Sequence, residues 1–389
     1  MSRRGRIVVL GMMSKMPVAG VVWQTVHYLV GLTRMGYETY YVEAHARTPS
    51  SFVSPDDPSG SQGAAAFIAG VMQRFGLEHR WAFHARHDDG AFYGLTGPQV
   101  RRLYRSADLL INLHGGTTPL PEHAETGRLV YLETDPVLTQ VALKRGRQRT
   151  IDLLTPHVAC FTFAENYGKP DCLVPVCEGF DFMPTRQPVV LDFWDAEGCP
   201  PCPVFTTVGN WRQPWRSFHW RRETYTWSKH LEFAKFLDLP SRTGQVFELA
   251  LSSYDADDQR LLESHGWCVR DAGPLSRDPD TYRDYIRRSF AEFTAAKDQN
   301  VRLRSGWFSD RSATYLAAGR PVVTQETGFS NLLPSGEGLF GVETVEEAAD
   351  AVAEIAGDYD RHSTAAKAIA REYFSHEVVL GDLLGRLGV

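Results

Sequence analysis

RSGWFSDRSATYLAAGRPVVTQETGFSNLLPSG, residues 304–336, is the stretch that decides the fold of this chain. A loop of small and hydroxyl residues leads into a helix predicted over residues 312–318, which Gly319 ends. A buried strand at residues 321–324 and a second glycine turn follow. The first turn of a helix carries unpaired N–H groups and a partial positive charge, which together bind phosphate. With the guanidinium of Arg311 added, the stretch predicts an anion site at the carboxyl edge of a parallel sheet.

A glycine that ends a helix is typical of many α/β proteins, but the whole stretch is more specific. It resembles the donor-binding segment of GT-B fold glycosyltransferases, which move a sugar from a nucleotide diphosphate to an acceptor. The resemblance lies in the helix ending AAGRPVV and in the following TGF and PSGEGL loop. It implies an α/β protein with two Rossmann-like domains whose parallel sheets face an interdomain cleft. It also implies phosphate contacts from Ser309, Arg311 and Ser312, and sugar contacts from Gly328 and Phe329.

The chain departs from the family pattern at two positions. Many relatives carry one Glu five residues before the glycine that ends this helix, and another Glu eight residues earlier. Thr314 and Gly306 occupy these positions here. In place of a carboxylate that grips the ribose, the resemblance then implies a neutral hydrogen bond from Thr314.

Composition restricts the class of protein. A length of 389 residues suggests two domains, and 43% hydrophobic with 23% charged residues is typical of a soluble globular protein. A net charge of −6 argues against a nucleic-acid partner, so the Arg-rich stretches 144–149 and 211–222 are interpreted as solvated faces or phosphate-facing loops. No apolar run is long enough to span a membrane, and the opening MSRRGRIVVL is too short for a secretion signal, so we expect a cytoplasmic protein.

The six cysteines do not indicate a disulfide scaffold in a chain of this length. Cys199 and Cys202 have the spacing of a redox or metal motif, and Cys172 and Cys177 precede them, so four cysteines could hold zinc. A Cys-Pro-Pro-Cys in a linker is more often a surface turn. We therefore expect no metal and no cofactor, with a nucleotide-diphosphate sugar of the UDP or TDP type as co-substrate.

The first half of the chain reads as repeated βα units. A strand at residues 6–10, a helix at 21–35 and a strand at 38–42 form a βαβ unit, which calls for a parallel sheet. The dinucleotide fingerprint G-x-G-x-x-G is missing after the first strand, which argues against an NAD-dependent oxidoreductase. We expect a mobile loop at residues 48–63 and further strands at 108–113, 128–132 and 159–164.

The pattern restarts after a stretch rich in proline and acidic residues. We predict an acceptor-side domain at residues 1–185, a linker at 186–203 and a donor-binding domain at 204–370. A C-terminal helix at 371–389 is expected to pack back on the first domain, as in the family. Within the second domain we expect a helix at residues 227–237 and strands at 204–208, 247–251, 267–270 and 292–295.

Cations of the second domain are candidates for the donor site. The turn Gly209-Asn-Trp-Arg212 follows a predicted strand, and it resembles the family's turn against the diphosphate, as Lys229 resembles the accompanying lysine. Positive charge there would offset the negative charge that builds up on the leaving diphosphate. Exposed, purely solvated side chains are the alternative for Arg212 and Lys229.

Catalytic candidates come from the first domain. His114 follows a predicted strand at its carboxyl end, where its pKa would suit proton transfer, and Asp135 holds a similar position after the next strand. Glu43 ends another strand. A structural histidine and a turn-forming aspartate are the alternatives. Trp23 and Gln24 are expected to line the acceptor pocket.

The sequence therefore predicts a glycosyltransferase acting on a small-molecule, glycan or lipid acceptor. Glu133-Thr134-Asp135 also resembles the metal-binding acidic pair of the GT-A fold, a weaker reading given two βα-repeating halves. Two other functions stay open: a sugar-nucleotide epimerase on the same architecture, and a non-catalytic module that binds a nucleotide or glycan. Retention or inversion at the anomeric carbon and the oligomeric state are also open.

Overall fold

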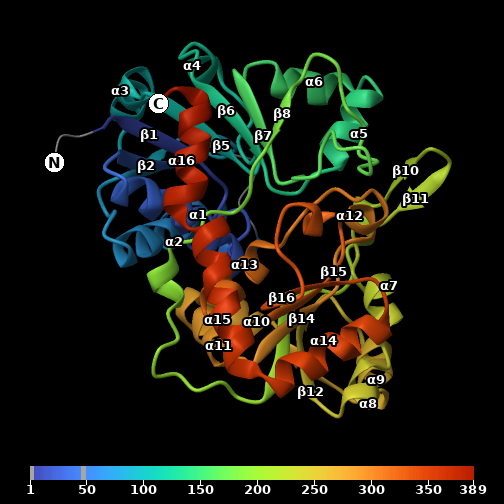
Figure 1. Cartoon of the computed structure of the whole chain (residues 1–389). Coiled ribbons are helices and arrows are strands. Elements are labelled where there is room, and N and C mark those ends of the chain that lie inside the picture. The colour runs from blue at the N-terminus through green and yellow to red at the C-terminus, as the bar shows by residue number, and fades with distance from the viewer. Residues whose placement is uncertain (1–3, 45–49) are drawn as a thin grey trace.

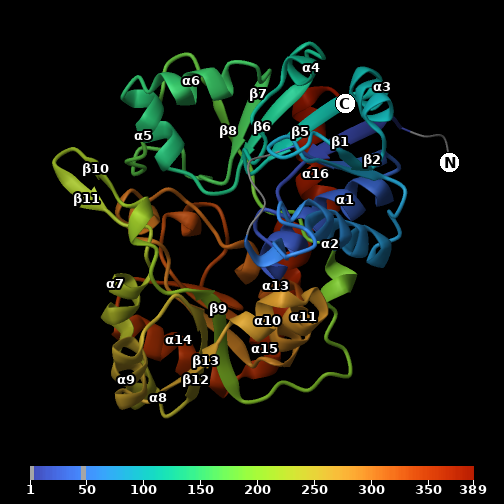
Figure 2. The ribbon, with the colours of Figure 1, turned by 180° about the vertical axis from the view of Figure 1, so that it is seen from behind.

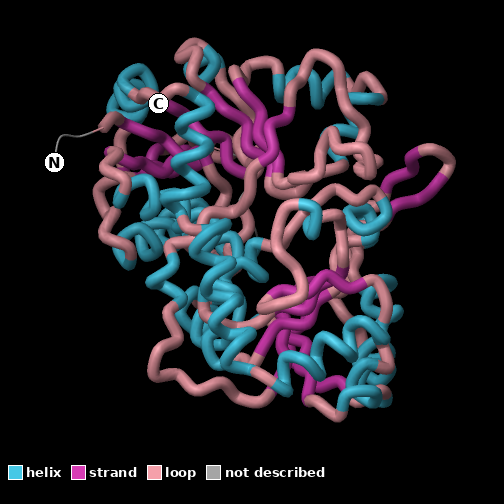
Figure 3. Tube along the Cα trace, viewed as in Figure 1, coloured by secondary structure: helices cyan, strands magenta, loops and turns pink. Residues whose placement is uncertain are grey.

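The structure is a computed structural model that describes residues 4–44 and 50–389 of the chain. Its strands form two large sheets, each with helices on both faces (Figure 3). One sheet lies above the other in Figure 1, and the red C-terminal helices run from the lower half to the upper half. No helix within these residues is both long and apolar enough to cross a membrane.

The upper half is built from the first part of the chain. Its elements are β1 (Arg6–Leu10), α1 (Ala19–Arg34), β2 (Glu38–Glu43), η1 (Ser50–Phe52), α2 (Ser61–Arg74), β3 (Trp81–His84), β4 (Phe92–Gly94), α3 (Gly97–Ser106), β5 (Leu109–Leu113), α4 (Pro121–Ala124), β6 (Leu129–Glu133), α5 (Leu138–Lys144), α6 (Gln148–Leu154), β7 (Ala159–Thr162) and β8 (Phe182–Pro184). The strand order is β4-β3-β2-β1-β5-β6-β7-β8, and every pair is parallel except β3 with β4.

The lower half follows the short 3₁₀ turn η2 (Leu191–Trp194). Its sheet has the order β13-β12-β9-β14-β15-β16, all parallel. The elements are β9 (Val204–Asn210), η3 (Pro214–Arg216), β10 (Phe218–Trp220), β11 (Glu223–Tyr225), α7 (His230–Phe233), η4 (Ala234–Phe236), α8 (Leu239–Thr243), β12 (Val246–Ser252), α9 (Ala256–Ser264), β13 (Trp267–Asp271), α10 (Gly273–Arg277), α11 (Pro279–Arg288), β14 (Ala291–Thr294), α12 (Asp298–Arg302), α13 (Asp310–Ala317), β15 (Val322–Gln325), η5 (Phe329–Asn331), β16 (Leu339–Val342), α14 (Val345–Gly357), α15 (Tyr359–Ile369) and the π-helical turn η6 (Ala370–Phe374). The last helix, α16 (His376–Leu387), returns to the upper half (Figure 1).

Burial explains why the central strands are apolar throughout. Ile7, Val8, Val9 and Leu10 of β1 are all fully buried, because helices cover both faces of the sheet. Such a sheet gathers the carboxyl ends of its strands at one edge, where ligands of doubly wound folds bind. The edges of both sheets therefore decide where a site can lie.

The segment between the halves is packed. Trp194 of η2 is fully buried, and Val189 pairs with Ser375 at the start of α16. Helix α16 in turn packs on α1, where Gly31 lies close to Leu380 and His376.

Two local predictions were wrong. The loop expected at residues 48–63 contains η1 and the start of α2, while its first two residues lie outside the described residues. The helix expected at 227–237 begins only at His230, because backbone bonds from Lys229 and His230 to the carbonyl of Trp211 hold the preceding residues in a turn.

Candidate functional site

A cavity of about 530 Å³ lies between the two sheets. Its walls come from loops that follow strands of both halves at their carboxyl edges, as expected for ligands of this architecture. The lining residues from the upper half are Met16, Pro17, Val18, Gly20, Val21, Gln24, Ser51 and Asp135, and those from the lower half include Gly209, Asn210, Gln213, Arg216, Trp227, Lys229, Ser252, Lys297, Trp307, Ser309, Asp310 and Arg311.

Lys229 is a buried cation at this cavity. Its side chain follows the turn that Trp211 anchors, and its Nζ lies 3.4 Å from Oγ1 of Thr294. Burial lowers the pKa of Lys229 well below its usual value, and the charge of Arg311 lowers it further. No carboxylate in the described part of the chain forms an ion pair with Lys229, so an anionic ligand in the cavity would favour its charged form.

Arg311 stands in the first turn of α13, where the protein itself holds its guanidinium. Nε donates to Oε1 of Glu292 at 2.5 Å, Nη1 to the carbonyl of Val208, and Nη2 to Oγ1 of Thr294 at 2.9 Å. Burial lowers the pKa of Arg311, but the charge of Glu292 outweighs burial and the net shift is upward. Glu292 is fully buried, so this ion pair is part of the framework as well as of the cavity wall.

Lys297 is a cation that sequence reasoning missed. It follows β14 at the carboxyl edge, and its Nζ donates to Oδ1 of Asp135 from the upper half. The same Nζ lies 3.7 Å from the ring centroid of Trp227, and the guanidinium of Arg216 lies 4.6 Å from that centroid. Burial lowers the pKa of Lys297, while Asp135 opposes the shift. Its position directly after a predicted strand was the one available signal.

The start of α13 combines predicted and unexpected residues. Ser309 occupies the N-cap position of the helix, without a capping bond from its side chain, and lines the cavity, as does Asp310, whose pKa is raised by burial. Ser312 is fully buried behind this surface, and its Oγ has no hydrogen-bond partner within residues 4–44 and 50–389. Thr314 donates to the carbonyl of Arg311 at 2.6 Å and lines a small neighbouring pocket, not the main cavity.

The predicted sugar-side glycine is used for packing in this structure. A Cβ at Gly328 would lie 2.8 Å from Nδ2 of Asn166, and one at Gly306 would lie 2.4 Å from the Asn166 backbone nitrogen. Both glycines also have positive φ, which favours glycine. Because neither carries a Cβ, the loop of the upper half that holds Asn166 can lie close against them. Phe329 is fully buried against Phe308, with ring centroids 5.3 Å apart. The sugar contacts of Gly328 and Phe329 stay a prediction.

Of the predicted phosphate turn, only one end reaches the cavity. Gly209 lines it, whereas Arg212 forms a bidentate pair with Asp258, at 2.5 Å from Nη2 to Oδ1 and 2.8 Å from Nε to Oδ2. This bonding lowers the pKa of Asp258 to about 2. Arg212 is therefore already neutralised outside the cavity lining.

The two catalytic candidates differ in position. Asp135 lines the cavity, whereas His114 is not among its lining residues. Nδ1 of His114 lies 2.9 Å from Oγ1 of Thr134, and Nε2 is buried with no hydrogen-bond partner in the part of the chain that the structure describes. Burial lowers the pKa of His114 to about 4, so the imidazole is neutral at pH 7. Glu43 accepts hydrogen bonds from Ser14 and lies away from the cavity.

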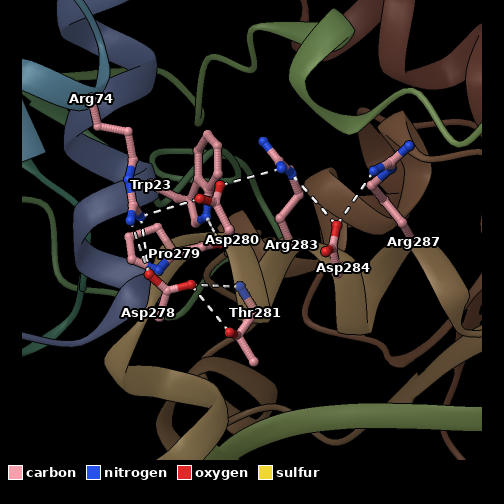
Figure 4. Close-up of polar contacts among 9 residues, drawn as sticks. All are labelled: Trp23, Arg74, Asp278, Pro279, Asp280, Thr281, Arg283, Asp284 and Arg287. Carbon is pink, nitrogen blue, oxygen red and sulfur yellow. Dashed lines mark hydrogen bonds and ion pairs between the residues drawn. The ribbon is translucent and has the colours of Figure 1, made fainter.

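The two residues expected to line the acceptor pocket, Trp23 and Gln24, also differ in position. Gln24 lines the cavity, whereas Trp23 is buried behind it and its Nε1 donates to the carbonyl of Pro279 at 2.8 Å. Figure 4 shows this bond beside the pairing of Arg74 with Asp278 and Asp280, which ties α2 to the start of α11. Trp23 thus helps to hold the two halves together.

Metal-ligating residues are not clustered in the described part of the chain: no group of three or more His, Cys, Asp or Glu side chains is placed to hold an ion there. Cys177 is buried, with Sγ 3.2 Å from the carbonyl of Gln140, and Cys202 is exposed. The Cys-Pro-Pro-Cys segment therefore does not meet the other cysteine pair.

Comparison with known proteins gives matches only at the level of structure. No family model matches the chain, and no curated protein matches its sequence. The crystal structure of Anabaena Alr3699/HepE in complex with UDP and glucose is similar with a TM-score of 0.56 and 12% identity, covering 99% of this chain and 100% of that one. AviGT4, a glycosyltransferase involved in avilamycin A biosynthesis, is similar with a TM-score of 0.54 and 12% identity, covering 98% of this chain and 96% of that one.

A third match is an alpha-glucosyltransferase in complex with UDP-glucose and DNA containing an abasic site, with a TM-score of 0.54, 11% identity and coverage of 98% of both chains. The likeness to all three structures extends over nearly the whole length of each chain. The α/β fold predicted from the sequence is thereby confirmed: the chain has the GT-B fold.

Proposed function

We propose that this protein is a glycosyltransferase that moves a sugar from a nucleotide diphosphate, of the UDP or TDP type, to a small-molecule, glycan or lipid acceptor. The observation that carries the proposal is the set of buried cations, Lys229, Lys297 and Arg311, on one wall of a cavity between two parallel sheets. Structural neighbours crystallised with UDP or UDP-glucose share this architecture, which supports the same ligand class.

The lower wall would hold the diphosphate. Lys229 and the residues at the start of α13 line the cavity, and Arg311 keeps N–H groups that its protein contacts do not use. As the bond from the sugar to the diphosphate breaks, negative charge grows on the leaving oxygen. Fixed cations in a buried site stabilise that charge more than water does.

The upper wall would hold the acceptor and its proton. Asp135 is the proposed base, because its carboxylate lines the cavity and belongs to the half that carries Gln24. Lys297 pairs with Asp135 and so holds its carboxylate at the cavity wall. His114 stays a second candidate, because its Nε2 has no hydrogen-bond partner among the described residues.

We propose an acceptor other than nucleic acid, because the chain carries a net negative charge. The net charge is −6, although one structural neighbour was crystallised with DNA. A DNA duplex therefore belongs in the acceptor panel as a negative control, and transfer of sugar to it would overturn this part of the proposal.

Turnover with labelled UDP- and TDP-sugars against a panel of alcohols, glycans and lipids tests the function. We expect transfer to at least one acceptor, its loss in Lys229→Met, and its retention in Lys169→Met, a matched change at an exposed lysine outside the cavity. A changed sugar with donor alone would identify an epimerase. Nucleotide binding without turnover across the panel would identify a binding module.

A further inference from the structure

Two Arg-rich segments, far apart in the sequence, meet on one surface. The connection between α5 and α6 carries one segment, and the hairpin of β10 and β11 carries the other. Nη2 of Arg145 donates to the carbonyl of His219, and its guanidinium lies 5.7 Å from the ring centroid of Trp220. Figure 2 shows the hairpin projecting from the molecule beside α5.

The combined surface is strongly positive. We define the basic surface as the exposed side chains of Lys144, Arg145, Arg147, Arg149, Arg221 and Arg222. It stands out on a chain whose net charge is −6. Glu223 also lies on the hairpin, but it pairs with Arg302. Asp152 is an exposed carboxylate on α6, so the six cations are only partly neutralised and still attract an extended anionic partner.

The hairpin turn carries its arginines against backbone preference. Arg221 and Arg222 have φ of 49° and 69°, and Trp220 pairs with Glu223 across them. A two-residue turn with both central residues at positive φ is of the I′ class, which prefers Asn-Gly. Arginine at both positions costs stability, so the fold gives no reason for them and a binding role does.

An exposed tryptophan accompanies the charges. Trp215 of η3 is 71% exposed and lies a few residues before β10 in the chain, and the next residue, Arg216, lines the cavity. The other hairpin aromatics are covered: Phe218 stacks on Tyr225 at 5.4 Å. The Trp220 ring lies under Arg145 and Arg221. Single-stranded nucleic acid needs successive open aromatic faces, whereas a lone interfacial Trp among arginines fits a lipid headgroup layer.

We propose that the basic surface docks the protein on a membrane of anionic phospholipids, with Trp215 at the headgroup level. Each Lys or Arg near such a membrane changes the partition coefficient by about fivefold, so the six cations give a firm but salt-sensitive attachment. The hairpin is a rigid platform for this contact, because its inner face belongs to an apolar cluster with α5 and the loop before β8. The proposal does not depend on the proposed sugar transfer.

Sedimentation with vesicles tests the docking without any activity measurement. We expect binding to vesicles of phosphatidylcholine with phosphatidylglycerol, and little binding to phosphatidylcholine alone. The Arg221→Asn and Arg222→Gly double variant should bind about 25-fold more weakly, since two cations are removed. Its thermal midpoint should be equal or higher, because Asn-Gly suits the turn, so loss of fold cannot mimic the result. Trp215→Ser should weaken binding as well.

The matched control removes two exposed arginines elsewhere: Arg102→Gln with Arg105→Gln on α3. This variant should bind anionic vesicles like the wild type. Equal loss in both double variants would mean that only net charge matters and would overturn the proposal. Equal binding to neutral and anionic vesicles would also overturn it, as would retention of DNA by the basic surface without any vesicle binding.

Discussion

Replacing Arg311 by Ala should damage the fold as well as the donor site, because the guanidinium serves both. The change removes the partner of Glu292, a fully buried carboxylate, together with hydrogen bonds to Val208 and Thr294. Breaking a buried ion pair at one end costs about 3–5 kcal/mol, since the other charge is left without compensation. Urea unfolding measures this loss as a lower midpoint at an unchanged slope.

A second variant separates stability from binding. The Arg311→Met and Glu292→Gln double variant removes both charges, so its loss of stability should be less than half that of Arg311→Ala. A guanidinium has five N–H groups. Three of them are used inside the protein, which leaves two for phosphate. Losing these contacts should weaken nucleoside diphosphate binding by about 10- to 150-fold in the double variant.

Two results would refute this reasoning. A loss below about 1 kcal/mol for Arg311→Ala would show that the pair with Glu292 is not structural. Wild-type nucleotide affinity in the stable double variant would remove Arg311 from the donor site.

Three further predictions concern ionisable groups. Burial raises the pKa of Glu133 to about 7, so the native state holds its proton and this contribution to stability is lost as pH rises through 7. Glu133→Gln should therefore be more stable than the wild type at pH 8, by about 1–3 kcal/mol in urea unfolding, and similar to it near pH 4; equal stabilities at both pH values would contradict this. Hydrogen bonds from Asn331, Asn166 and Arg304 lower the pKa of Asp171 to about 2. The free energy of unfolding should therefore fall as pH drops from about 4 toward 2. In an acid titration followed by circular dichroism, Asp171→Ala should make this fall less steep. The lowered pKa of Lys229 means that its ammonium loses charge at a lower pH than a free lysine does. Nucleoside diphosphate affinity should therefore fall with rising pH below the range in which a free lysine titrates, in the wild type but not in Lys229→Met; a pH-independent wild type would exclude a phosphate contact from Lys229.

Much of the fold was predictable because parallel strands are continuous apolar runs. The strand at residues 6–10 was placed at the bounds of β1, and the helix before Gly319 differs from α13 by two residues at its start. The hairpin of β10 and β11 was missed, because its turn carries Arg221 and Arg222 where a sequence pattern would show Asn and Gly. The sequence lacks the Asn-Gly pair that indicates a tight hairpin turn, so no local pattern predicted β10 and β11.

The site was less predictable than the fold, since side-chain partners are set by tertiary contacts. Lys229 and Arg212 looked equivalent in the sequence, yet one is buried at the cavity and the other is paired with Asp258. Lys297 contacts Asp135 over a long sequence separation, which no local pattern encodes. Gly328, which the family resemblance placed at the sugar, packs against Asn166.

Calorimetric titration of the wild type and Lys229→Met with UDP, UMP and uridine tests the central claim most directly. The account predicts that the wild type binds UDP more tightly than UMP and uridine, because the second phosphate reaches the buried cations, and that most of this difference disappears in Lys229→Met. Equal affinity for all three compounds, or no binding of UDP, TDP or GDP at all, would contradict a diphosphate site in the cavity between the sheets.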